Sequence, residues 1–181
     1  YLHSEFVGLS PATLRQLGVK THESAFDVLF IVLQRMSEGA RLLDVDFLRQ
    51  SLALAYRLIY GSGAQDLSGM ETANGRVRRL RTLRLLPLRR LGTEPAAAAD
   101  AGLFLPDAAQ GVPEALLQCL DLKIVAPALF DGDEGGLVRR LLMGMGLRGL
   151  TPAAVIADGV VPFVKEATAA DADAVALCLA F

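Results

Sequence analysis

Side chains that commonly carry chemistry in proteins are few and scattered in this chain of 181 residues. Its two histidines are His3 and His22, and its two cysteines are Cys119 and Cys178. No C-x-x-C, H-E-x-x-H, Walker or G-x-S-x-G spacing occurs, so neither a metal centre nor an activated nucleophile is predicted. The sequence therefore predicts a chain that is not an enzyme, with no catalytic residue, metal ligand or cofactor of its own.

Two glycine-rich segments have the spacing of ligand-binding loops but lack the required context. GMGLRG at 144–149 matches the G-x-G-x-x-G of dinucleotide sites, which needs a preceding strand, whereas the preceding residues here have helical periodicity. We interpret Gly144 or Gly146 as a left-handed helix C-cap, with a nucleotide site as the weaker alternative. DGDEGG at 131–136 is predicted to be an acidic turn without a ligand, because Leu142 stands where a calcium loop needs glutamate.

The most prominent charged feature is a run of arginines between residues 76 and 90. Such a run could neutralise several nucleic-acid phosphates if its guanidinium groups shared one face. Leucines rather than aromatic residues separate the arginines, so no stacking platform for single strands is predicted. We expect a solvated face or a contact with the acidic second half of the chain, and the alternative is a nucleic-acid-binding module. The candidate contact residues are Arg76, Arg78, Arg79, Arg81, Arg84, Arg89 and Arg90.

Charge is divided unevenly along the chain. Residues 1–90 carry 13 basic and 8 acidic side chains, a net +5, and residues 91–181 carry 5 and 12, a net −7. This division favours either nucleic-acid binding by the first half or attraction between the halves. The hydrophobic content of 52% predicts a packed core. The longest apolar runs, 28–33 and 174–181, are too short to span a membrane, so a soluble chain is expected.

Both cysteines lie in apolar segments and are expected to be small buried hydrophobic residues, with a disulfide or a reactive thiol as the alternative. Nothing in the sequence implies an oxidising compartment. We therefore expect an intracellular location, cytoplasmic or nuclear.

Helices are predicted in the first third of the chain. Ser10 and Pro11 open a short one that reaches Leu17, and others are predicted at about 21–38 and 46–60. The helix at 21–38 is apolar nearly all round, so we expect it to be central and buried. The glycine-rich residues 61–75 that follow are predicted to be a loop or linker.

Short strands are predicted at 80–92, 101–106 and 122–127, with a connection at 95–100. Further helices are expected at 113–120, at about 137–144, from Thr151 to Val164, and at 171–179. The order predicts a helix-rich α+β fold with a small sheet of about three short strands in the middle of the chain. Its parts are a helical segment 1–60, the loop or linker 61–75, and a β hairpin with helices over 76–181. The last part packs with 1–60 as one domain, or as a domain plus a fragment.

Two segments of the chain echo each other on either side of residues 80–106. They are QLGVKTHESAFDVL at 16–29 and GMGLRGLTPAAVI at 144–156. This arrangement resembles the segments that follow the ATPase module in sacsin-like and NO VEIN-like large proteins, where two such units flank a β hairpin. The turn departs from that pattern, since Gly92-Thr93-Glu94 replaces the Asp-Gly turn.

The GHKL-type nucleotide module of that family has an E-x-x-x-N box and a D-x-G-x-G loop. Neither motif occurs in this chain, and Asp133 stands where the loop needs glycine. The resemblance therefore does not imply ATP binding by any residue of this chain. The resemblance implies a non-catalytic structural and interaction module of a large intracellular, chaperone-like protein. Its expected partners are neighbouring domains of the same polypeptide or other proteins, and no membrane partner is expected.

Overall fold

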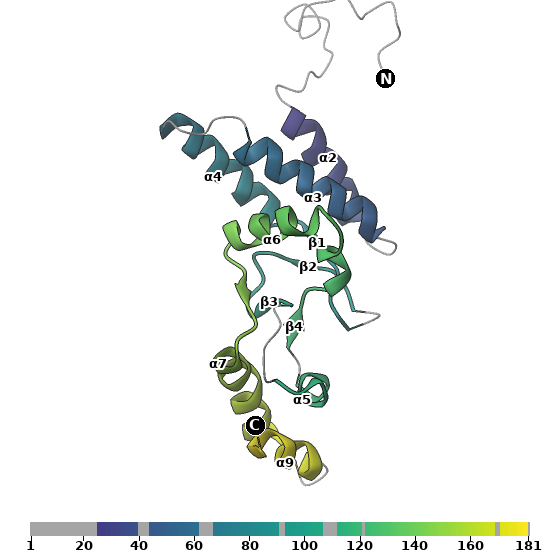
Figure 1. Cartoon of the computed structure of the whole chain (residues 1–181), viewed down its shortest axis with the longest axis vertical. Coiled ribbons are helices and arrows are strands. Elements are labelled where there is room, and N and C mark those ends of the chain that lie inside the picture. Colours follow the sequence, from purple (N-terminus) through teal and green to yellow (C-terminus); the bar gives the residue numbers. More distant parts are fainter. Residues whose placement is uncertain are drawn as a thin grey trace, which may run out of the picture.

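A small sheet lies between two groups of helices (Figure 1). The computed structural model describes residues 25–39, 44–61, 67–90, 93–106, 112–120, 122–168 and 171–180. The short helix predicted to end at Leu17 lies outside these ranges. The order of helices, short strands and helices confirms the predicted helix-rich α+β fold.

Four helices form the first layer. They are α2 (Ala25–Glu38), α3 (Val45–Tyr60), α4 (Leu67–Arg81) and α6 (Gly135–Gly144). The helix α3 contacts both α2 and α6. Asp44 caps α3, because its carboxylate accepts the backbone N–H groups of Asp46 and Phe47 at 2.9 and 3.2 Å. The predicted helix at 46–60 is thus confirmed.

Residues 67–75 are helical, so the loop predicted at 61–75 is wrong over this part. Ala73, Val77 and Leu80 recur at helical spacing and are all buried. Their burial offsets the weak helix propensity of Gly75. Residues 62–66 lie outside the described ranges.

The helix α2 is not the central buried helix that its composition predicts. Phe26, Leu29 and Leu33 are buried on one face. The opposite face is exposed and carries Val28, Ile31 and Val32. The first layer therefore covers only one side of this apolar helix.

The central sheet has three short parallel strands in the order β4-β3-β5. They are β3 (Leu103–Leu105), β4 (Lys123–Ile124) and β5 (Arg148–Gly149). A separate antiparallel pair joins β1 (Arg84–Leu86) and β2 (Ala96–Ala97). An isolated bridge between Leu88 and Val125 connects the segment after β1 to the end of β4.

Each of the three predicted strand segments contains one strand, whereas β2 and β5 are additional. The strand β2 lies within the predicted connection 95–100. The hairpin also differs from the expected one. The strand β1 pairs with β2 and not with β3, which belongs to the parallel sheet.

Alternating side chains of the sheet divide the core into two clusters. Leu103 and Leu105 pack with the first layer of helices. Phe104 and Ile124 belong to the other cluster, which contains residues of a second layer of short helices on the opposite face of the sheet. The sheet is therefore covered on both faces, as parallel strands require.

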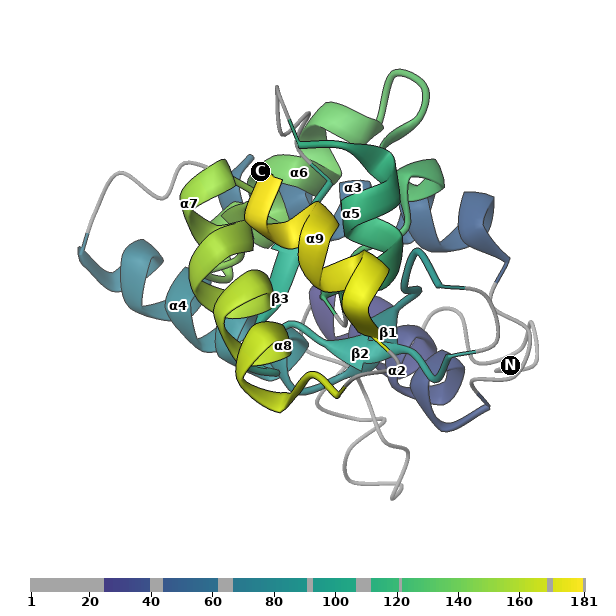
Figure 2. The ribbon, with the colours of Figure 1, turned by 90° about the horizontal axis from the view of Figure 1, so that it is seen from below.

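Short helices form the second layer. They are α5 (Glu114–Cys119), α7 (Pro152–Val155), α8 (Val161–Glu166) and α9 (Ala172–Ala180). Figure 2 shows α9 lying against α8 and α5. The hydroxyl of Thr151 accepts the N–H of Ala154 at 3.2 Å, and Pro152 follows it. This confirms the predicted cap.

A π-helical turn, Ile156–Val160, joins α7 to α8. Pro162 has no N–H to donate to the preceding turn, and the wider turn accommodates its ring. Gly159 approaches α5 so closely that a Cβ there would lie 2.9 Å from Leu120 Cδ1. The turn thus lets the chain pack tightly against the end of α5.

The GMGLRG segment ends α6 in a Schellman motif. Gly146 has a φ of 96°, and its N–H donates to the carbonyl of Met143 at 2.9 Å. The N–H of Leu147 donates to the carbonyl of Leu142 at 3.1 Å, and both side chains are buried. The predicted left-handed C-cap is confirmed at Gly146.

Within the described ranges, no helix combines the length and the apolar character needed to cross a membrane.

We predict that Leu85→Ala lowers the free energy of unfolding by about 2–5 kcal/mol. Leu85 is 3% exposed and lines a void of only about 10 Å³, so the truncation removes buried contacts. Leu179→Ala is the matched control, because Leu179 is 74% exposed. Its effect is expected to stay within about 0.5 kcal/mol. Equal losses in urea unfolding would contradict the assignment of Leu85 to the core.

Two glycines with open surroundings are expected to respond in opposite ways to alanine. A Cβ at Gly75 or Gly102 would meet nothing within 4 Å. Gly75 lies inside α4, so Gly75→Ala should stabilise the fold by about 0.5–1 kcal/mol. Gly102 has a φ of 70°, so Gly102→Ala should destabilise it by about 1–2 kcal/mol. Thermal unfolding of both variants checks the signs.

Candidate functional site

The seven arginines proposed from the sequence do not form one surface. Arg76, Arg78, Arg79 and Arg81 lie on α4, Arg84 lies in β1, and Arg89 and Arg90 follow that strand. The helix at 67–81 spreads the first four around its axis. The sequence predicts a loop at 61–75 and no helix that continues to Arg81.

Arg79 attaches α4 to α2. Its Nη1 donates to Asp27 Oδ1 at 2.8 Å, and its guanidinium lies 4.1 Å from the centre of the Phe30 ring. An ion pair and a cation–π contact thus act on one side chain. Arg76 adds to the same interface, since it lies over the Phe26 ring at 5.1 Å.

Arg84, Arg89 and Arg90 contact the acidic second half of the chain. Arg84 forms an ion pair with Asp100 at 3.9 Å, and Arg89 forms one with Glu114. Arg90 donates to the backbone carbonyl of Gln118 at 3.4 Å. These contacts fit the expected attraction between the halves. Arg78 and Arg81 make no ion pair or side-chain hydrogen bond with another described residue.

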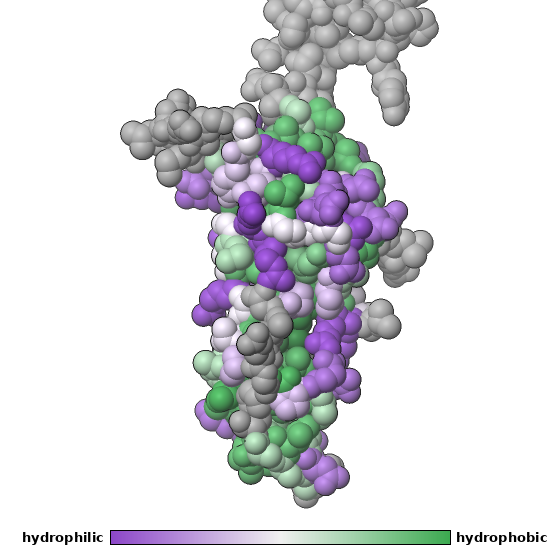
Figure 3. Space-filling view, in the orientation of Figure 1, coloured by the Kyte–Doolittle hydropathy of each residue, from purple (hydrophilic) through white to green (hydrophobic). Residues whose placement is uncertain are grey.

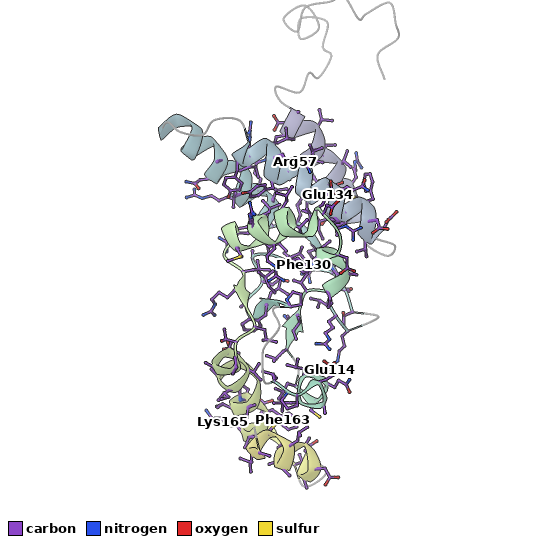
Figure 4. All side chains as sticks on the ribbon, viewed as in Figure 1. Arg57, Glu114, Phe130, Glu134, Phe163 and Lys165 are labelled. Carbon is purple, nitrogen blue, oxygen red and sulfur yellow. The ribbon has the colours of Figure 1, made fainter. Side chains whose placement is uncertain are left out.

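A cleft of about 320 Å³ opens beside α5, where Arg89 and Arg90 meet it. Its polar lining consists of Arg89, Arg90, Glu114 and Gln118, and its apolar lining of Leu117, Leu120, Leu122 and Ile124. Figure 4 shows Glu114 on α5. The hydrogen bond from Arg89 lowers the pKa of the Glu114 carboxyl. The pair therefore stabilises the fold at neutral pH, and this contribution is lost as the pH falls through the lowered pKa.

An exposed apolar stripe on α2 is the surface feature that sequence reasoning missed. It consists of Val28, Ile31 and Val32, which are 50%, 39% and 38% exposed. The spacing of i, i+3 and i+4 places all three on one face of the helix. Figure 3 shows hydrophobic surface over α2 at the upper end of the molecule. We call these residues the α2 stripe.

The two cysteines differ in environment. Cys178 is buried as expected, and burial together with the nearby Cys119 thiol raises the pKa of the Cys178 thiol. Cys119 is exposed, so the expectation of a buried side chain is wrong there. The reason is its position at the end of α5, where Leu116 and Leu120, the residue after the helix, are buried in the core instead. Both thiols are free.

The acidic turn at 131–136 has a structural contact. A Cβ at Gly135 would lie 1.9 Å from the carbonyl oxygen of Phe130, so only glycine fits this approach. Glu134 forms an ion pair with Arg57 of α3 at 3.6 Å (Figure 4). No group of three or more metal-ligating side chains is found among the described residues.

The GMGLRG segment has the wrong context for a dinucleotide. It runs from the helix α6 into the strand β5, whereas the binding fingerprint runs from a strand into a helix. The amide groups of Gly146 and Leu147 already donate to α6. The geometry therefore does not support the weaker alternative of a nucleotide site.

Comparison with protein-family models, curated proteins and solved structures finds no match for this chain.

Arg79→Ala is expected to lower the free energy of unfolding by about 1 kcal/mol, since an exposed ion pair and a cation–π contact are lost together. Arg78→Ala, one residue away, is the control and should change it by no more than about 0.5 kcal/mol. Urea unfolding at low and high salt measures both. A loss at Arg79 that matches the loss at Arg78 would contradict the proposed link between α4 and α2.

Proposed function

We propose that this chain is a non-catalytic structural and interaction module, which binds a neighbouring domain or another protein through the α2 stripe. The observation that carries the proposal is the exposed apolar face of α2, which the described helices leave uncovered. A helix that is apolar all round is normally buried, because exposing aliphatic surface to water is unfavourable. The exposed face of α2 therefore calls for a cover.

The proposed partner presents an apolar helix face and belongs to a different protein or domain. Ile31 and its neighbours offer aliphatic side chains at helical spacing, which is the pattern that helix-to-helix docking uses. Arg35 continues the row one turn further on and is exposed, so it supplies a polar rim. The sequence resemblance to large chaperone-like intracellular proteins supports the same kind of role.

The nucleic-acid alternative has less support. Five of the seven arginines hold contacts inside the chain, to Asp27, Leu58, Asp100, Glu114 and Gln118. Only Arg78 and Arg81 lack such contacts with the described residues, and a few phosphate contacts give weak, strongly salt-dependent binding.

Photo-crosslinking in the native cell tests the proposal. A benzophenone side chain at position 31 should crosslink to one protein or domain, and the same group at Arg140, exposed on α6, should not. Val28→Glu in the same chain should abolish the product, because a charge is buried at the contact. Since Val28 is 50% exposed, this change should leave the stability of the isolated chain within about 0.5 kcal/mol.

Four results would contradict the proposal. One is a product at position 140 but not at 31. Another is a crosslink within the chain, together with a large stability loss in Val28→Glu, which would mean that the chain covers its own stripe. A crosslink to a second copy would replace the proposed partner with a homo-oligomer. Turnover of ATP by the isolated chain would contradict the non-catalytic role.

A further inference from the structure

We propose that Cys119 and Cys178 are a redox-active pair of thiols, which a small dissolved disulfide such as glutathione disulfide converts into a covalent bond between α5 and α9. Cys119 is the last residue of α5, and Cys178 lies near the end of α9. They are the two cysteines of the chain, and both thiols are free. The pair lies in the second layer of helices, so the proposal does not depend on the α2 stripe.

The packing of α9 brings the two residues together. Cα atoms of α9 and α5 come within 8 Å of each other, and Figure 2 shows the two helices side by side. Among the described residues of α9, Cys178 is the buried one, and it shares an apolar cluster with Leu116 and Leu120. The side chain that anchors α9 therefore points toward the end of α5 that carries Cys119. A disulfide needs Cα atoms within about 7 Å, which helices in direct contact provide.

Helical spacing places Cys119 on the side of α5 that α9 covers. The residues of α5 that line the cleft are Glu114, Leu117 and Gln118, and Leu116 is buried in the core. At about 100° per residue, Cys119 borders the buried face on the side away from the cleft. The helix α9 packs on α5, and none of its described residues lines the cleft. Cys119 and α9 therefore lie on the same side of α5.

Their different exposures give the two thiols different roles. Cys119 is exposed, so a dissolved disulfide can reach its sulfur. Cys178 is 4% exposed and is shielded from such a molecule. Burial, and secondly the nearby Cys119, raises the pKa of the Cys178 thiol, which keeps this sulfur protonated and weakly reactive toward solutes. Cys119 is thus the thiol that reacts first, and Cys178 is the thiol that completes the reaction.

The reaction is a thiol–disulfide exchange in two steps. The Cys119 thiol loses its proton, its sulfur bonds to one sulfur of glutathione disulfide, and the other glutathione leaves as a thiolate that takes up a proton. The Cys178 thiol then loses its proton and its sulfur bonds to the Cys119 sulfur, so that the second glutathione leaves in the same way. Two electrons pass from the protein thiols to the reagent, which becomes two molecules of reduced glutathione.

Intact mass spectrometry of the whole chain in glutathione buffers tests the proposal. After equilibration, N-ethylmaleimide blocks the free thiols, so the reduced chain gains two maleimides and the disulfide form gains none. The equilibrium constant for the disulfide should be at least about tenfold larger in the folded chain than in the chain unfolded by urea, because folding raises the effective concentration of the two sulfurs. The bond closes a loop of about 60 residues, so the oxidised chain should melt about 5–15 °C higher than the reduced one.

Three variants assign the roles of the two thiols. Cys178→Ala should stop the reaction at a mixed disulfide between Cys119 and glutathione. Cys119→Ser should leave the folded chain unmodified, because the remaining thiol is buried. The matched control moves the exposed thiol by one residue, in a chain that combines Cys119→Ser with Gln118→Cys. Because position 118 faces the cleft, this chain should keep its glutathione adduct and form the internal disulfide no more readily than it does in urea.

The proposal is overturned if the folded and the unfolded chain have the same equilibrium constant, or if glutathione stays on Cys119 of the unchanged chain. A disulfide between two copies in place of the internal one also overturns it. An internal disulfide that forms equally well from position 118 would show that the placement of Cys119 is irrelevant. If Cys178→Ala does not fold, Cys119→Ser decides, since a glutathione adduct on its buried thiol contradicts the assigned roles.

Discussion

The burial of a three-residue strand on both of its faces is the constraint on which the rest of the fold depends. In β3, Leu103 and Leu105 face one cluster and Phe104 faces the other, and none exceeds 6% exposure. Such a strand is stable only if helices cover both sides of the sheet. The connections supply them, because α5 leads from β3 to β4 and α6 leads from β4 across to β5. Two crossover connections of the same hand that run in opposite directions across a sheet lie on opposite faces of it. The strand order β4-β3-β5 therefore places α5 in one layer and α6 in the other.

The fold class and most helices could be predicted because their signals are local. Thr151-Pro152 opens α7 and Gly146 closes α6 through hydrogen bonds within a few residues. The strands β2 and β5 could not be predicted, since two alanines or an Arg-Gly pair carry no strand preference. They pair because β1 and β3 present their edges to them, and such partners lie far away in sequence. The parallel arrangement was hidden for the same reason.

The two helix errors have opposite causes. Glycines and polar residues predict a loop at 61–75, but Ala73, Val77 and Leu80 gain enough burial to make 67–81 helical, so tertiary packing overrides propensity. In α2 the composition predicts full burial, yet the described layers cover only the face with Phe26. The periodicity of apolar residues indicates which side chains can be buried. Which of them are buried depends on how many helices and strands pack against the helix. An uncovered stripe is therefore invisible in the sequence and visible only in the structure.

The arginines of the candidate site illustrate how a charge count misleads without positions. Arg57, Arg84 and Arg89 form ion pairs with Glu134, Asp100 and Glu114, which join the basic first half to the acidic second half. Each pair is exposed enough that its contribution to stability is small, so the apolar clusters supply most of the energy that holds the layers together. Each of these carboxylates would compete with a phosphate for the same guanidinium group. In the described part of the chain, the α2 stripe stays exposed and apolar and lies outside these ion pairs.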